Sequence, residues 1–175
     1  MSCKCFKTNN PPDNRKSFSE KVELSKCKCE SRLVVSERKS RFYIDSEVNK
    51  SLIDKIKIDG FLDNSTEKPK CDYLFIYKNL QNVELTYVFV ELKGTDVKHA
   101  VEQLDNSIDT FYTQGYLNKK QVRGAIVFSV FPKDSGTYRN AKRTLYKKIQ
   151  PKIKDFRLEE KSKNMGYNPI SDKFH

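Results

Sequence analysis

Three ionisable residues in the middle of the chain have the types and the spacing needed to hold a divalent cation and activate water. Asp72 precedes an apolar run at residues 73–77, and Glu91 and Lys93 follow or end a second apolar run at residues 85–90. Side chains alternate along a β-strand, so Glu91 and Lys93 should point to the same face. The spacing therefore predicts an acid and a base at one strand end, with a further acid nearby.

The two apolar runs predict a β-hairpin that brings Asp72 next to Glu91. Both runs are rich in aromatic and β-branched residues, and a polar centre with Asn79, Gln81 and Asn82 separates them. With the turn centred between Gln81 and Asn82, Asp72 and Glu91 become cross-strand neighbours. Their Cβ atoms would then lie roughly 4.5–5.5 Å apart.

Two carboxylates at this separation repel each other unless one is protonated or a cation lies between them. Hard oxygen ligands favour Mg²⁺ or Mn²⁺. Such an ion positions a water molecule, lowers its pKa and stabilises charge that develops on phosphorus. The alternative is an ordinary surface pair of Glu91 and Lys93 at a strand end. Asp72 in register favours the metal site.

These residues resemble the pattern of the PD-(D/E)XK nuclease superfamily. That pattern has an acid at the start of one strand, an acid-X-Lys triplet on the next strand and then a helix; here these are Asp72, Glu91-Leu92-Lys93 and the segment from Thr95. The resemblance covers residues 45–130 and implies a restriction-endonuclease-like fold. It also implies that Asp72, Glu91 and the Leu92 carbonyl hold the metal, with Lys93 near the nucleophilic water.

The resemblance extends to two further residues and fails at one. Some branches of the superfamily carry a glutamine on the following helix, which Gln103 could match, so Gln103 joins the expected catalytic set. A glutamate on the helix before the acidic strand sometimes adds a ligand, and Glu47 is the candidate, although a first-turn acid favoured by the helix dipole is the simpler explanation. Cys71 stands where the superfamily name has proline.

The surrounding segments predict an α/β fold with a mixed central sheet flanked by helices. Apolar residues recur at helical spacing after Thr95, and residues 122–130 form a continuous apolar run typical of a buried strand. A helix between two strands predicts a parallel crossover. We also expect a helix from Asp45 to about Ile58, and a last helix from Thr137 that continues to Phe156 with a kink at Pro151.

The chain carries a strong excess of positive charge, with a formal net charge of +11. Such an excess favours a polyanionic partner. The last helix should present cations near the site, and we expect four of them to contact nucleic acid; the alternative is a solvated helix face. The four are Arg139, Lys142, Arg143 and Lys147.

The sequence predicts three parts of the chain: an arm at residues 1–31, the nuclease-like domain at residues 32–160 and a frayed tail at residues 161–175. Four cysteines in the arm could hold a structural Zn²⁺, or could be four plain thiols: Cys3, Cys5, Cys27 and Cys29. The sequence has no run of about 18 apolar residues and no apolar secretory signal, which predicts a cytoplasmic protein without a membrane partner.

The leading hypothesis is a Mg²⁺-dependent nuclease that hydrolyses phosphodiester bonds in DNA. Two alternatives stay open: a catalytically inactive basic module that binds nucleic acid or a protein partner, and an RNase. A homodimer would suit cleavage of both strands of a duplex, but no interface patch stands out in the sequence.

Overall fold

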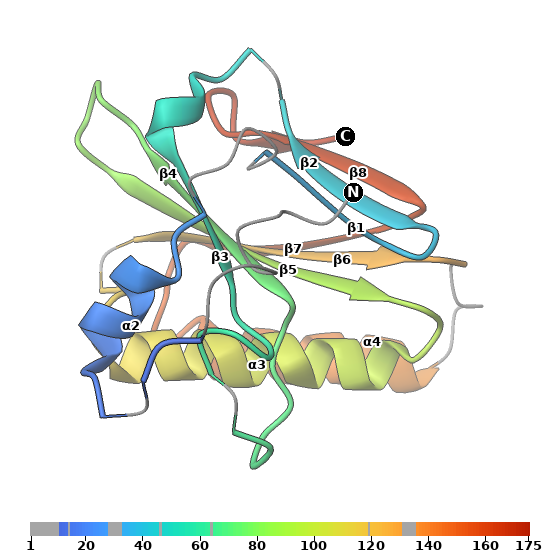
Figure 1. Cartoon of the computed structure of the whole chain (residues 1–175). Helices are drawn as coiled ribbons and strands as arrows, with labels where there is room; N and C mark the ends of the chain where they lie inside the picture. The colour runs from blue at the N-terminus through green and yellow to red at the C-terminus, as the bar shows by residue number, and fades with distance from the viewer. Residues whose placement is uncertain are drawn as a thin grey trace.

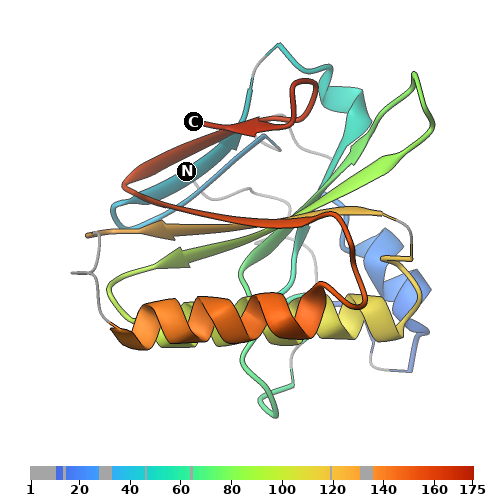
Figure 2. The same cartoon turned by 180° about the vertical axis from the view of Figure 1, so that it is seen from behind.

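The computed structural model describes residues 11–13, 15–27, 33–45, 47–63, 65–118, 120–130 and 136–175. The described part is a mixed α/β fold with a five-stranded sheet in the middle (Figure 1). Two long helices cover one face of this sheet, and a four-stranded sheet covers the other face (Figures 1 and 2). The prediction of a mixed α/β fold is confirmed, but helices do not flank both faces.

The central sheet has the order β3-β4-β5-β6-β7. Its strands are β3 (Ile53–Lys57), β4 (Tyr73–Lys78), β5 (Leu85–Lys93), β6 (Gln121–Phe128) and β7 (Phe156–Ser162). Tyr73 pairs with Val90 and Lys78 with Leu85 in the antiparallel β4–β5 hairpin, which confirms the predicted register. β5 and β6 are parallel, as the crossover predicted.

The helical layer consists of α3 (Val97–Thr113) and α4 (Gly136–Ile149), with the short α2 (Phe18–Leu24) at its edge. Asp96 caps α3 by accepting a hydrogen bond from the His99 N–H, so this helix begins near the predicted residue. Phe18 of α2 packs edge-on against Phe111 of α3. Among the described residues, no helix is both long and apolar enough to cross a membrane.

The second sheet has the order β1-β2-β8-β9, with β1 (Val34–Glu37), β2 (Ser40–Ile44), β8 (Asn164–Asn168) and β9 (Lys173–Phe174). β8 runs parallel to β2, and its Met165 and Tyr167 are buried in a second core between the two sheets. The prediction of a frayed tail at residues 161–175 is therefore wrong. Only two large apolar side chains of this short strand face the core, which is too weak a pattern to stand out in the sequence.

The expected helix from Asp45 to Ile58 is also wrong. A short 3-10 helix, η2 (Lys50–Leu52), leads into β3, which pairs with β4 along its whole length. Ile53 faces the second sheet and Ile56 faces the helices. Apolar residues that serve two opposite faces resemble a helical stripe in sequence, and strand pairing decides between the two structures.

The last helix is shorter than predicted. α4 ends at Ile149, two residues before Pro151, and Phe156 already begins β7. Proline disfavours a helical conformation in the residue before it, so it terminates this helix instead of kinking it. Ile153 and Phe156 are still buried in the core between the helices and the central sheet.

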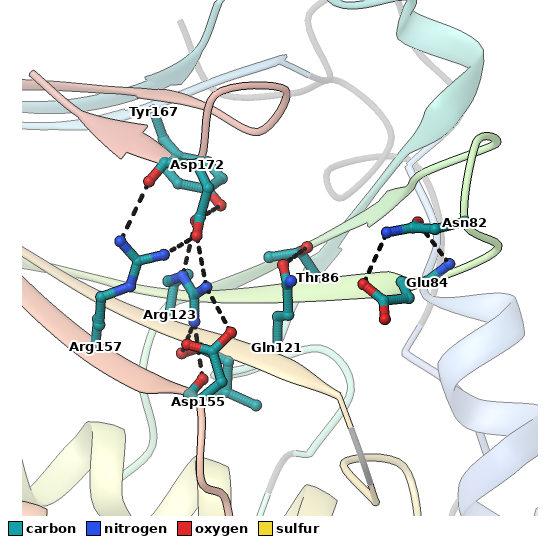
Figure 3. A network of polar contacts seen from close by, with 10 residues as sticks. Asn82, Glu84, Thr86, Gln121, Arg123, Asp155, Arg157, Tyr167 and Asp172 are labelled. Carbon is teal, nitrogen blue, oxygen red and sulfur yellow. Dashed lines mark hydrogen bonds and ion pairs between the residues drawn. The ribbon is translucent and has the colours of Figure 1, made fainter.

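A buried arginine joins the two sheets (Figure 3). Arg123 of β6 is fully buried and donates to both carboxylate oxygens of Asp172, at 2.8 and 2.7 Å, and to Asp155 at 3.0 Å. The Tyr167 hydroxyl donates to the same Asp172 at 2.6 Å. These contacts fasten the turn between β8 and β9 to the central sheet.

Candidate active site

The confirmed hairpin register places Asp72 beside the end of β5. Asp72 comes one residue before β4, and its Oδ2 accepts a hydrogen bond of 2.8 Å from the Leu92 N–H. A residue in a strand directs its N–H and C=O to the same side. The Leu92 carbonyl therefore points past the end of β4, toward the side on which Asp72 lies.

Glu91 is buried at this strand end with an unsatisfied carboxylate. It is 1% exposed, its Oε1 lies 3.6 Å from the Lys93 Nζ, and its Oε2 has no hydrogen-bond partner among the described residues. Burial, and next the charge of Asp72, raise the pKa of Glu91 to about 9, against the opposing effect of Lys93. An orphaned buried oxygen of this kind costs free energy unless a cation or proton satisfies it.

Asp72 is also held in an environment that disfavours its charge. Burial raises the pKa of Asp72 to about 6, although the hydrogen bond from Leu92 lowers it. The charges of Glu37 and Asp59 raise this pKa further. The sequence did not point to Glu37 or Asp59, because Glu37 ends β1 and Asp59 lies in the turn after β3.

Lys93 is oriented by Gln103, as the helix spacing allowed. The Lys93 Nζ donates to the Gln103 Oε1 at 2.6 Å, and the Gln103 Nε2 donates to the Lys70 carbonyl at 2.8 Å. Gln103 is 8% exposed, so it is an internal bridge between α3, β5 and the segment before β4. Its place fits a residue that fixes the direction of Lys93.

Two further residues of α3, missed in the sequence, hold the segment that leads to Asp72. The Asn106 side chain donates to the Pro69 carbonyl at 3.0 Å, and the Ser107 Oγ accepts from the Cys71 N–H at 2.9 Å. Ser107 lies one helical turn after Gln103, and Asn106 precedes it. Polar residues beside an apolar helical stripe were the available signal, but the sequence did not show which loop they contact.

Several predicted residues lie elsewhere. Glu47 is exposed and precedes η2, at the end of β3 opposite to the end that pairs with Tyr73, so it is not brought to Asp72. Cys27 is buried, while Cys3, Cys5 and Cys29 lie outside the described residues. Within the described ranges no group of three His, Cys, Asp or Glu residues could hold a metal. The zinc hypothesis stays a prediction.

The predicted cations of α4 differ in their surroundings. Lys142 donates to both carboxylate oxygens of Glu160 at 2.8 Å, so its charge is largely neutralised within the protein. Arg143 and Lys147 are exposed, as is Arg139. Farther along, Lys148 and Lys152 pair with two acids of α3.

The residues at the strand end fit a small divalent cation that keeps some of its water. Two carboxylates and one backbone carbonyl are hard oxygen donors, and Mg²⁺ commonly takes one or two protein carboxylates and completes its shell with water and phosphate oxygens. The unsatisfied Oε2 of Glu91 gives this assignment its structural support.

No family model matches this chain, and no curated protein or solved structure matches it at a significant level.

Proposed function

We propose that the protein is a Mg²⁺-dependent nuclease that hydrolyses phosphodiester bonds in DNA. The observation that carries this proposal is the buried Glu91, with one orphaned oxygen, beside Asp72 and Lys93 at one strand end. A structural ion pair would not need the second acid or the orphaned oxygen. A site that receives a cation uses both.

The proposed roles follow from the contacts of each residue. Asp72, Glu91 and the Leu92 carbonyl would hold the ion, which supplies positive charge for a phosphate oxygen and lowers the pKa of a bound water. Lys93 places its amino group at the site, where the hydrogen bond to Gln103 directs it. From there it would donate to a phosphate oxygen or orient the attacking water.

The order of elements adds support for a restriction-endonuclease-like fold. An acid before β4, an acid-X-Lys triplet at the end of β5, a helix α3 and a parallel strand β6 follow one another along the chain. This is the order that the resemblance to the PD-(D/E)XK superfamily implies.

The test is cleavage of plasmid DNA, single-stranded DNA and RNA with Mg²⁺ or with EDTA. Wild type should cut DNA only with Mg²⁺, and Glu91→Gln, Asp72→Asn and Lys93→Ala should each lose about 100-fold or more of that activity. Glu84→Gln, at the far tip of the hairpin, is the matched control and should cut like wild type. Thermal unfolding should show that Mg²⁺ stabilises wild type but not Glu91→Gln.

Retained cleavage in Glu91→Gln or Lys93→Ala would refute the mechanism. Cleavage of RNA but not DNA would identify an RNase. Binding of DNA without any cleavage would identify the inactive binding module.

A further inference from the structure

Two turns rich in positive charge lie at the same end of the molecule as the candidate active site (Figures 1 and 2). One joins β1 to β2 and the other joins β7 to β8. Together with the adjoining strand residues they carry five exposed cations, which we call the basic rim: Arg38, Lys39, Arg41, Lys161 and Lys163.

Hydrogen bonds fix the basic rim against the strand ends that carry the site. The Ser40 Oγ donates to the Lys93 carbonyl at 3.3 Å. The Lys163 N–H donates to the Phe128 carbonyl at the end of β6, and the Arg41 N–H donates to the Lys163 carbonyl, both at 2.7 Å. The two turns are therefore joined to each other and to the residue that should face the substrate.

The backbone of both turns is strained at a cationic residue. Arg38 has a φ of 50° and Lys163 a φ of 66°, in the left-handed region that favours glycine. Such strained conformations occur often in ligand clamps. Both positions hold a cationic residue where glycine would fit better, which is consistent with a role of the positive charge in ligand binding.

The charges of the basic rim are available to a partner. Within the described part of the chain, none of the five side chains forms an ion pair, although the exposed Glu37 ends β1 directly before the first turn. On α4, Lys142 and Lys148 are each paired with an acid, whereas Arg143 and Lys147 are exposed and form no ion pair within the described residues. The rim is the better candidate for phosphate contacts because it gathers five such cations on two turns that hydrogen bonds join to the ends of β5 and β6.

We infer that the basic rim binds the phosphodiester backbone of the strand on one side of the cleaved bond. The choice of a nucleic acid as partner rests on the proposed function. The contact is to phosphates, so it is independent of base sequence and depends strongly on salt. It replaces α4 as the main site of backbone binding.

The test is the affinity of Arg38→Asn/Lys163→Asn for fluorescently labelled DNA, measured by anisotropy in EDTA at several KCl concentrations. Asparagine tolerates the left-handed conformation, so the double variant removes charge without new strain. Its affinity should fall at least tenfold near 100 mM KCl, and the slope of log affinity against log salt should fall by about 2. Arg143→Gln/Lys147→Gln removes the same charge from α4 and should stay within about twofold of wild type.

A second pair, Lys39→Gln/Lys161→Gln, leaves both strained positions untouched and should show the same loss of affinity. The test therefore holds even if the first variant folds poorly. Wild-type affinity in both rim variants, an equal loss in the α4 variant, or no binding by wild type would overturn the inference. An RNA strand of the same length should show the same loss, and a loss confined to DNA or to RNA would overturn a contact to phosphates.

Because EDTA prevents metal-dependent hydrolysis, binding is measured apart from cleavage. If the rim variants lose binding but wild type shows no Mg²⁺-dependent cleavage, phosphate binding by the basic rim is supported and the proposed nuclease activity is refuted. If wild type cleaves DNA but the rim variants bind as well as wild type, the nuclease activity is supported and phosphate binding by the rim is refuted.

Discussion

Glu91 is the residue where the demands of folding and of the proposed chemistry conflict most clearly. The carboxylate is buried beside another acid, and its pKa is raised to about 9. Folding would favour a neutral side chain at this position, while cation binding requires the charged one. Functional sites commonly lower the stability of the folded protein in this way, because groups that serve the chemistry are unfavourable for folding.

The first prediction concerns the pH dependence of stability in metal-free buffer. Between the ordinary pKa of 4.5 and the raised value of about 9, the folded protein keeps a proton on Glu91 that the unfolded chain has released. Raising the pH through this range therefore lowers the free energy of unfolding. Glu91→Gln lacks this loss and should be the more stable protein at pH 7, by on the order of 3 kcal/mol.

Urea unfolding of both proteins from pH 5 to pH 9 measures this difference. Glu84→Gln should follow the wild-type curve. Parallel curves for wild type and Glu91→Gln would show that Glu91 titrates normally.

Among the elements, the β4–β5 hairpin combines a well-defined register with a strained tip. Val83 lies in the loop between the strands, is 85% exposed and has a φ of 57°. A β-branched residue in the left-handed region is an outlier. No described contact offsets the strain, so the loop should accept a residue suited to this conformation.

The second prediction is that Val83→Asn or Val83→Gly stabilises the protein, by about 1 kcal/mol. With glycine, part of the stability gained by relieving the strain is lost again, because glycine increases the conformational freedom of the unfolded chain. The measurement is the midpoint of urea unfolding, and DNA cleavage should be unchanged because the tip lies far from Asp72. Equal or lower stability in both variants would contradict the assigned backbone conformation.

The sequence was sufficient to predict those elements that a local pattern of residues specifies. The alternating apolar runs and the polar turn predicted the β4–β5 register, and that register alone brought Asp72 to Glu91 and Leu92. Helical spacing placed Gln103 beside the apolar stripe of α3, near the strand ends, but its contact with Lys93 is visible only in the structure.

Elements that depend on distant partners could not be predicted in this way. Residues 53–57 form a strand because β4 lies beside them, and residues 164–168 because β2 does. Ser40 gave no local sign that its hydroxyl would contact the Lys93 carbonyl. The strand ends around the site therefore include residues that only the assembled sheets identify.

For the whole molecule, the third prediction tests the link between the two sheets. Asp172 is the main acidic partner of the fully buried Arg123, and its φ of 53° suits asparagine. Asp172→Asn leaves the Arg123 charge with only the exposed Asp155 as an acidic partner, and it also removes the ion pair of Asp172 with Arg157. It should lower the free energy of unfolding by about 3 kcal/mol, since an uncompensated buried charge is costly.

Urea unfolding checks this value. The matched control, Asp109→Asn, breaks the exposed pair with Lys152 and should cost less than about 1 kcal/mol. A change in Asp172→Asn no larger than in the control would show that Arg123 does not depend on Asp172.

The parallel pairing of β2 with β8 has a consequence for the order of folding. Arg41 lies opposite Asn164, so these strands can join only after a long stretch of intervening chain has been brought together. The β4–β5 hairpin closes over a short loop and should form early. A folding chain would thus assemble its acidic pair first and the basic rim last, so the proposed phosphate contacts would be complete only once both sheets have formed.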